Sequence, residues 1–279
     1  MLYLIPTPVG NMEDMTFRAV RLLQEADLIL CEDTRTSQPL LQHYGITGKR
    51  LMAHHKFNEH GTAHNIVERL LSGENVCLIT DAGTPGISDP GFLLVREAVE
   101  AGVEVQTLPG ATAFVPALVS SGLPTDRFCF EGFLPQKKGR MTRLTELSHE
   151  PRTMIIYESP RRIVKTLEQL EETMGGDRHI SACREISKLH EESVRGTVSE
   201  VLAHFRETEP RGEFVIIIEG CTKAKPTDDA NDSIKADTDA PRKESKYQRK
   251  LRMRGGIDPP PKTHPNPPCE GGRTKQANN

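Results

Sequence analysis

The chain has 279 residues, of which 36% are hydrophobic, 27% are charged and 5% are aromatic, and its formal net charge is −3. From Thr222 onward there are 13 Lys and Arg against 8 Asp and Glu, a balance of +5, so the first 221 residues carry −8. This length suits one large domain or two modest ones. An acidic body argues against a protein that coats nucleic acid without specificity, although it leaves room for a local basic patch.

The cysteines and apolar runs indicate a reducing compartment. Six cysteines are scattered along the chain without a CxxC pair, and three of them lie in apolar, strand-like runs. This usage is typical of buried free thiols. No basic-then-apolar segment opens the chain, and no apolar run approaches the roughly 18 residues of a membrane span. We therefore expect a soluble, cytosolic protein.

In the first half of the chain, apolar runs alternate with segments of helical periodicity. The expected strands are 2–5, 28–31, 76–80 and 103–108, and the expected helices are 16–26, 38–44, 62–71 and 92–101. Such alternation is typical of a mostly parallel sheet covered by helices. We assign residues 1–115 to an N-terminal α/β domain.

The second half has a different pattern. The expected strands are 128–133, 153–157, 179–184, 193–198 and 214–219, and the expected helices are 138–148, 160–174 and 198–208. Too few residues separate 179–184 from 193–198 for a crossover helix, which predicts an antiparallel pair. Residues 116–221 are therefore expected to form a second α/β domain with a mixed sheet, after a boundary near 113–124.

The last segment, 222–279, loses apolar periodicity and holds 8 of the 20 prolines. This composition predicts a disordered tail. Its basic stretch 248–254 is interpreted as a solvated run rather than an RNA contact.

Three loops follow predicted strands of the first half. The most conspicuous is Asp81–Gly91, DAGTPGISDPG, and the others are 6–11 and 109–113. Glycines let a ligand approach the main chain closely, and the carboxyl ends of parallel strands meet at one edge of a sheet. The three loops therefore predict one concave binding floor. Neither GxGxxG nor GxxxxGK[ST] is present, so the usual dinucleotide and P-loop sites are not supported.

No metal site is expected. His60 and His64 have the i,i+4 spacing of helical ligands, and His54 and His55 lie nearby, but no HExxH motif accompanies them. No Ser/His/Asp or Cys/His arrangement for nucleophilic catalysis stands out either.

Basic residues follow two strands of the second half. Lys137, Lys138, Arg140 and Arg143 come after strand 128–133, and the pair Arg161-Arg162 follows strand 153–157. Basic residues in a first helical turn oppose the helix dipole, which favours an anionic partner such as phosphate over a stabilising role. The alternative is that they are solvated helix starts.

Several segments together resemble the tetrapyrrole-methylase superfamily, and within it the bacterial enzymes that methylate a ribose of 16S ribosomal RNA. They are LYLIPTPVGNMEDMTFRA, ADLILCEDTRT, LITDAGTPGISDPG, LPGATA, FEGFLPQKKGR, YESPRR and REISKLHEE. The resemblance spans residues 2 to 220. It implies two α/β domains of the tetrapyrrole-methylase type with the cofactor in the cleft between them, and a homodimer.

The resemblance implies S-adenosylmethionine-dependent 2′-O-methylation of cytidine 1402 of the 16S RNA in the small ribosomal subunit, with no metal. The cofactor-binding residues it implies are Pro8, Asp81, Ala82, Gly83, Thr84, Ile87, Ser88, Pro109, Thr112, Ala113, Phe133, Leu134, Arg184 and Glu213. The RNA-binding residues it implies are Arg35, Lys137, Lys138, Arg140, Arg161 and Arg162.

The general base is left open among three carboxylates at predicted strand ends, Asp33, Asp81 and Glu158. Two other functions also stay open. One is methylation of a tetrapyrrole precursor of cobalamin or sirohaem on the same fold, and the other is RNA binding without catalysis.

Overall fold

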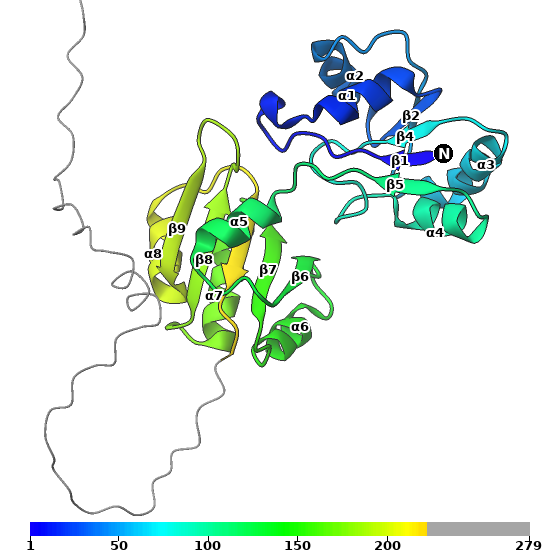
Figure 1. Cartoon of the computed structure of the whole chain (residues 1–279). Coiled ribbons are helices and arrows are strands. Elements are labelled where there is room, and N and C mark those ends of the chain that lie inside the picture. The colour runs from blue at the N-terminus through cyan, green and yellow to red at the C-terminus, as the bar shows by residue number, and fades with distance from the viewer. Residues whose placement is uncertain (222–279) are drawn as a thin grey trace, which may run out of the picture. The chain divides into compact units, whose positions relative to one another are not determined.

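The computed structural model describes residues 1–221 (Figure 1). The predicted tail 222–279 and its basic stretch lie outside the described residues. By their contacts, the described residues belong to one compact unit, and they form two five-stranded sheets.

The first sheet is parallel throughout, with the strand order β3-β2-β4-β1-β5. Its strands are β1 (Leu2–Leu4), β2 (Leu28–Cys31), β3 (Leu51–Ala53), β4 (Val76–Leu78) and β5 (Val105–Thr107). The connecting helices are η1 (Met12–Asp14), α1 (Phe17–Glu25), α2 (Thr34–His43), α3 (Glu59–Leu71) and α4 (Phe92–Glu100). The predicted alternation and parallel sheet are confirmed.

Strand β2 shows why this sheet is covered on both faces. Leu28 and Leu30 pack with residues of α3 and α4, whereas Ile29 and Cys31 pack with residues of α1 and α2. Successive side chains of a strand point to opposite faces, so a continuous apolar run needs a helical layer on each side. Figure 1 shows α1 and α2 together on one face of the sheet and α3 and α4 on the other.

Two elements of this half differ from the prediction. Strand β3 was not expected, because its apolar run Leu51–Ala53 is only three residues long. Helix α2 begins at Thr34 rather than residue 38. The Asp33 carboxylate accepts the N–H of Arg35 and so caps the helix earlier in the chain.

The second sheet is mixed, in the order β6-β7-β10-β8-β9. Its strands are β6 (Phe128–Phe133), β7 (Thr153–Glu158), β8 (His179–Arg184), β9 (Glu192–Thr197) and β10 (Phe214–Ile218). Strands β6 and β7 are parallel, and the other neighbours are antiparallel, including the predicted pair of β8 and β9. The mixed sheet is therefore confirmed.

Helices cover both faces of this sheet too. Helices α6 (Arg140–Leu147), α7 (Ile163–Met174) and α8 (Val198–Glu207) share one core with it, and α5 (Phe114–Ser121) packs on the opposite face. Helix α5 was not expected, because 113–124 was taken as a boundary. The predicted domain limit at 115/116 falls inside α5 and stays a prediction.

Cys31, Cys77 and Cys183 are buried free thiols, as predicted, and burial raises the pKa of Cys77 to about 12. Within residues 1–221, no helix has the length and apolarity needed to cross a bilayer. The cytosolic location stays a prediction.

Two valines test the packing of helices on the second sheet. Val201 of α8 is fully buried, whereas Val119 of α5 is 69% exposed. Removing two buried carbons costs transfer free energy and leaves a cavity, so Val201→Ala should lower the free energy of unfolding by about 2 kcal/mol. Val119→Ala, the matched control on a helix, should change it by less than about 0.5 kcal/mol. Equal effects in urea unfolding would contradict this packing.

Candidate active site

The three glycine-bearing loops follow β1, β4 and β5, which are neighbours in the first sheet. Thr7 and Gly83 exchange two backbone hydrogen bonds, each 2.9 Å long. The Thr7 hydroxyl also donates to the Thr80 carbonyl at 2.9 Å, and the Thr84 hydroxyl donates to the Ala111 carbonyl at 3.0 Å. The loops are thus joined to one another.

Two glycines allow this close packing. Gly83 has a φ of +87°, a left-handed conformation that a side chain would strain. A Cβ on Gly110 would lie 2.7 Å from the Cβ of Pro6, closer than real Cβ contacts. A larger residue at 110 would push loop 109–113 away from loop 6–11, and one at 83 would strain the backbone of loop 81–91.

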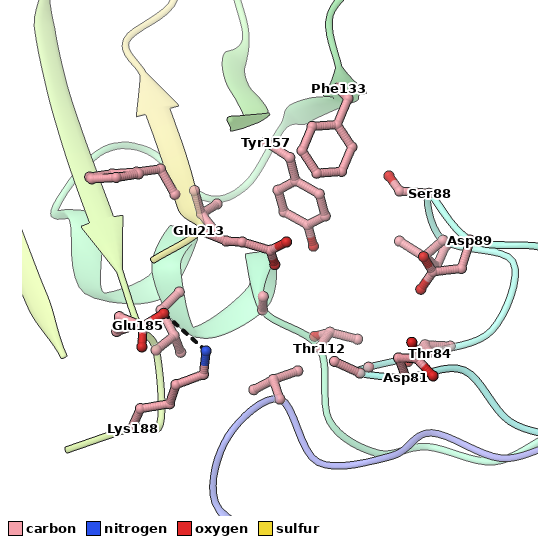
Figure 2. A pocket seen from close by; sticks show the side chains of 18 of the residues that line it. Asp81, Thr84, Ser88, Asp89, Thr112, Phe133, Tyr157, Glu185, Lys188 and Glu213 are labelled. Atoms are coloured by element: carbon pink, nitrogen blue, oxygen red, sulfur yellow. Dashed lines mark hydrogen bonds and ion pairs between the residues drawn. The ribbon is translucent and has the colours of Figure 1, made fainter. Parts of the chain in front are cut away.

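A cavity of about 340 Å³ lies against these loops (Figure 2), within the size range of small-molecule sites. Its lining includes ten of the residues predicted to bind the cofactor: Asp81, Ala82, Gly83, Thr84, Ile87, Ser88, Thr112, Ala113, Phe133 and Glu213. We call it the donor cavity, after the methyl donor that the family resemblance implies.

Four of the predicted cofactor residues do not line this cavity. Pro8 lines a second cavity instead, and Pro109 lines neither. Leu134 is buried in the core of the second sheet. The Arg184 guanidinium donates to Glu192 at 2.5 Å and is mostly buried in that ion pair. The place of a residue near the end of a predicted strand does not determine which way its side chain points.

Nine lining residues were missed: Val9, Glu32, Asp89, Tyr157, Glu185, Ile186, Lys188, Phe214 and Val215. Several lie inside segments already singled out, such as Asp89 in DAGTPGISDPG and Tyr157 in YESPRR. The same segments therefore contain the signal for these lining residues.

The donor cavity is acidic. Among the described residues that line it, five carry carboxylates (Glu32, Asp81, Asp89, Glu185 and Glu213), and one, Lys188, is basic. The Lys188 ammonium is engaged by Glu185 at 2.9 Å. Burial, followed by repulsion from Glu32, Glu213 and Asp81, raises the pKa of Asp89 to about 7. Such a surplus of negative charge suits a cationic ligand.

One wall of the donor cavity is aromatic. The rings of Phe133 and Tyr157 lie 5.5 Å apart, centroid to centroid, and Phe130 lies behind Tyr157 at 5.1 Å. Figure 2 shows the Tyr157 hydroxyl and the Glu213 carboxylate directed into the same space. Burial raises the pKa of Tyr157 to about 12, so its hydroxyl stays a hydrogen-bond donor at neutral pH. A flat, polar ring fits beside this wall.

The backbone is strained beside this cavity. Within residues 1–221, three non-glycine residues have positive φ: Ser88 at 65°, Glu185 at 51° and Ser187 at 66°. Ser88 and Glu185 line the donor cavity. Strain of this kind costs about 1–3 kcal/mol per residue and clusters at functional sites.

A family model described as Tetrapyrrole (Corrin/Porphyrin) Methylases matches residues 1–202. The chain belongs to this methylase family. Its reaction therefore uses a methyl donor. The negative charge of the donor cavity is complementary to a methyl donor that carries positive charge.

Relatives and solved structures agree with this membership. The methylase is 48% identical over 223 residues to "Ribosomal RNA small subunit methyltransferase I" of Synechocystis, which covers 80% of each chain. It is also 48% identical to the protein of the same name from Pasteurella multocida, over 83% of each chain. The native form of uroporphyrin III C-methyltransferase from Thermus thermophilus has the same fold, with a TM-score of 0.55 and 20% identity, over 78% of this chain and 96% of that one.

The three candidate bases of this methylase lie in different environments. Asp33 caps α2 and pairs with Arg35 at 2.7 Å, and its hydrogen bonds from Arg35 lower its pKa to about 2. Asp81 lines the donor cavity, where burial and then the charge of Asp33 raise its pKa. Glu158 is buried away from the cavity. Asp81 is thus the candidate that faces ligand space.

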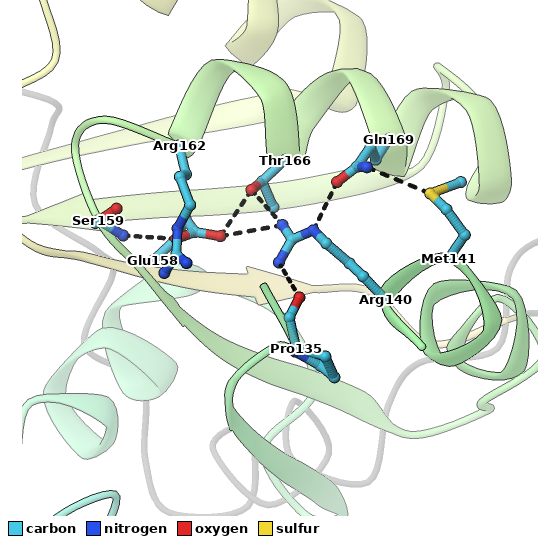
Figure 3. A network of polar contacts seen from close by, with 8 residues as sticks. All are labelled: Pro135, Arg140, Met141, Glu158, Ser159, Arg162, Thr166 and Gln169. Atoms are coloured by element: carbon cyan, nitrogen blue, oxygen red, sulfur yellow. Dashed lines mark hydrogen bonds and ion pairs between the residues drawn. The ribbon is translucent and has the colours of Figure 1, made fainter. Parts of the chain in front are cut away.

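Glu158 and Arg140 form the centre of a structural network (Figure 3). Glu158 accepts from Arg140 at 3.1 Å, Thr166 at 2.7 Å and Arg162 at 2.8 Å. Arg140 also donates to Gln169 at 2.7 Å and is only 6% exposed. Neither Glu158 as a base nor Arg140 as a phosphate ligand fits this structure, because both side chains are buried and already paired.

The predicted RNA-binding residues that remain differ in availability. Lys137, Lys138 and Arg161 are exposed. They follow β6 and β7, whose parallel pairing brings their carboxyl ends to one edge. Arg162 is partly buried against Glu158, and Arg35 is exposed but paired with Asp33.

The pKa of Glu158 shows how its network stabilises the fold. Burial alone would raise this pKa, but hydrogen bonds from Thr166 and Ser159 and the nearby arginines lower it instead. Its contribution to stability is therefore present at neutral pH and is lost as the pH falls through the lowered pKa.

Glu158→Gln should leave Arg140 without its buried counter-charge. Breaking one side of a buried pair costs about 3–5 kcal/mol, and we expect a loss of that size in the free energy of unfolding. The matched control is Glu146→Gln, which removes an exposed partner of Arg143 and should cost at most about 1 kcal/mol. If both variants unfold at the same urea concentration, the network is not stabilising.

Proposed function

We propose that this methylase transfers the methyl group of S-adenosylmethionine to the 2′-oxygen of a cytidine ribose in 16S ribosomal RNA of the small ribosomal subunit. The observation that carries the proposal is the acidic donor cavity on three joined loops, in a chain 48% identical to proteins named "Ribosomal RNA small subunit methyltransferase I". The homodimer that the family resemblance implies stays a prediction.

The lining residues fit S-adenosylmethionine. This molecule carries a sulfonium and an ammonium group against one carboxylate, so its net charge complements the carboxylates of Asp89 and Glu213. Its adenine fits the wall of Phe133 and Tyr157. When bound, it supplies a methyl group on a positively charged sulfur with a good leaving group.

The residues of this protein position the reacting groups, exclude water and accept a proton. Alignment of reacting groups supplies up to about 7–11 kcal/mol of rate acceleration. Asp81, at the end of β4 and held by the joined loops, orients the acceptor hydroxyl and takes its proton. Its raised pKa makes it a stronger base than an ordinary carboxylate.

Methylation of a tetrapyrrole precursor is the less favoured function. The solved corrinoid and porphyrin methyltransferases match at 19–20% identity, which shows the fold alone. The exposed Lys137, Lys138 and Arg161 offer an electrostatic surface for RNA phosphates.

The methyl acceptor can be identified with purified methylase, labelled S-adenosylmethionine and unmodified small ribosomal subunits. Label is expected on a ribose 2′-oxygen of 16S RNA. Label on a base, or RNA without label, would reject the proposed function.

Asp81→Asn should slow methyl transfer by about 10²-fold or more, since general-base catalysis is removed. Asp126→Asn, at an exposed position outside the cavity, is the matched control and should keep the wild-type rate.

Asp89 should make donor affinity depend on pH. With a pKa of about 7, its carboxyl is largely neutral at a pH one unit lower and largely ionised one unit higher. Affinity for S-adenosylmethionine should therefore rise with pH across neutrality, as measured by calorimetry. Asp89→Asn should remove this slope, and Asp126→Asn, at an exposed position outside the cavity, should keep it. A slope that persists in Asp89→Asn would assign it to another group.

The RNA surface can be tested by replacing Lys137, Lys138 and Arg161 with alanine together. Each phosphate contact contributes about 0.7–0.9 to the slope of log affinity against log salt, so binding of the ribosomal subunit should weaken and this slope should shrink. Lys165→Ala, at another exposed lysine, is the control. An unchanged salt slope, or an equal loss of affinity for S-adenosylmethionine, would contradict an RNA-binding role.

A further inference from the structure

A second cavity, of about 500 Å³, adjoins the donor cavity. Its lining residues are Pro8, Val9, Gly10, Met12, Thr36, Ser37, Pro39, Leu40, His43, Thr80, Asp81, Ala82 and Lys188. Four of them also line the donor cavity: Val9, Asp81, Ala82 and Lys188. The two cavities therefore share a wall, and Asp81 stands in it.

The second cavity has a different chemical character. Most of its lining comes from one face of α2 and from residues 8–12. The polar side chains of Thr36, Ser37, Thr80 and His43 lie beside apolar ones such as Val9, Met12 and Leu40, and Asp81 is the one carboxylate among the described residues of this lining. A cationic donor is therefore favoured in the first cavity, and a group with both polar and apolar parts in the second.

Ser37 gives an independent indication of a ligand. It is 2% exposed, and its hydroxyl has no nitrogen or oxygen partner among the described residues. The thiol of Cys31 lies within reach of this hydroxyl and is a weak partner. Buried hydroxyls are nearly always hydrogen-bonded, so one that has only a thiol as a partner, in the lining of an open cavity, is suited to bind a polar ligand.

Exposed apolar side chains flank the segments that form the second cavity. Phe17, 96% exposed, begins α1 shortly after Met12, and Leu189, 92% exposed, follows Lys188. The Ser187 hydroxyl donates to the Asp14 carboxylate at 2.5 Å, which ties these two segments together. Unstacked RNA bases bind to exposed aromatic and apolar side chains of this kind.

We propose that the second cavity holds the acceptor nucleotide, a ribonucleoside turned out of the RNA strand, with its ribose against Asp81. This inference rests on the proposed function, because it assigns the acceptor side of the same reaction. In the transfer, the bond from the methyl carbon to sulfur breaks as the bond to the ribose oxygen forms. The electron pair stays on the sulfur, and the hydroxyl proton passes to Asp81.

A bulky side chain at an exposed lining position tests this assignment without adding volume to the hydrophobic core. Thr36 is exposed on α2 and lines the second cavity but not the donor cavity. Thr36→Trp should fill the cavity, keep the affinity for S-adenosylmethionine and slow methyl transfer to the small subunit by about 10²-fold, the cost of a misplaced acceptor. Pro39→Trp, at a second exposed lining position, should do the same.

The matched control is Gln38→Trp, on the same helix but outside both linings. It should transfer methyl groups at the wild-type rate. The assignment is overturned if Thr36→Trp and Pro39→Trp also transfer at that rate, or if they lose affinity for S-adenosylmethionine as much as activity. Failure of the proposed function is distinguishable, because the wild-type protein itself would then place no label on a ribose.

Discussion

The pairing of Thr7 with Gly83 is the constraint on which the rest of the site depends. Parallel strands bring their carboxyl ends to one edge, but the loops that follow could still diverge. The two hydrogen bonds between Thr7 and Gly83, together with those from the Thr7 and Thr84 hydroxyls, join the three loops into one surface. Gly110 completes it by letting its loop pack on Pro6.

Acidic and basic side chains lie on different surfaces of the protein. Carboxylates gather where a cationic methyl donor is proposed, and burial, together with repulsion among these carboxylates, raises the pKa of Asp89 to about 7. Exposed basic side chains lie elsewhere, at the ends of β6 and β7, where RNA phosphates are proposed to bind. An acidic protein is thereby able to act on an anionic substrate, because the two signs of charge occupy different surfaces.

Much of this was predictable from sequence, since strong apolar periodicity and glycine-rich loops reflect local physics. The two sheets followed from it, whereas the ten lining residues of the donor cavity that were expected came from the family resemblance. The direction of individual side chains and the packing of elements in the folded chain could not be predicted in this way. Arg140 begins α6, where a basic residue suggests a phosphate site, yet it points inward to Glu158. Strand β3 was missed because its apolar run is only three residues long, and helix α5 was missed because it occupies an apparent boundary.

The joined loops 6–11, 81–91 and 109–113 are proposed to form a binding surface for S-adenosylmethionine. Calorimetric titration of the full chain tests it most directly, with Gly110→Ala as the variant that forces the loop against Pro6. Saturable binding at micromolar concentrations, weakened in Gly110→Ala without loss of the folded state, is the predicted result. Wild-type protein that shows no binding at such concentrations, or a Gly110→Ala protein that binds as tightly as wild type, would contradict it.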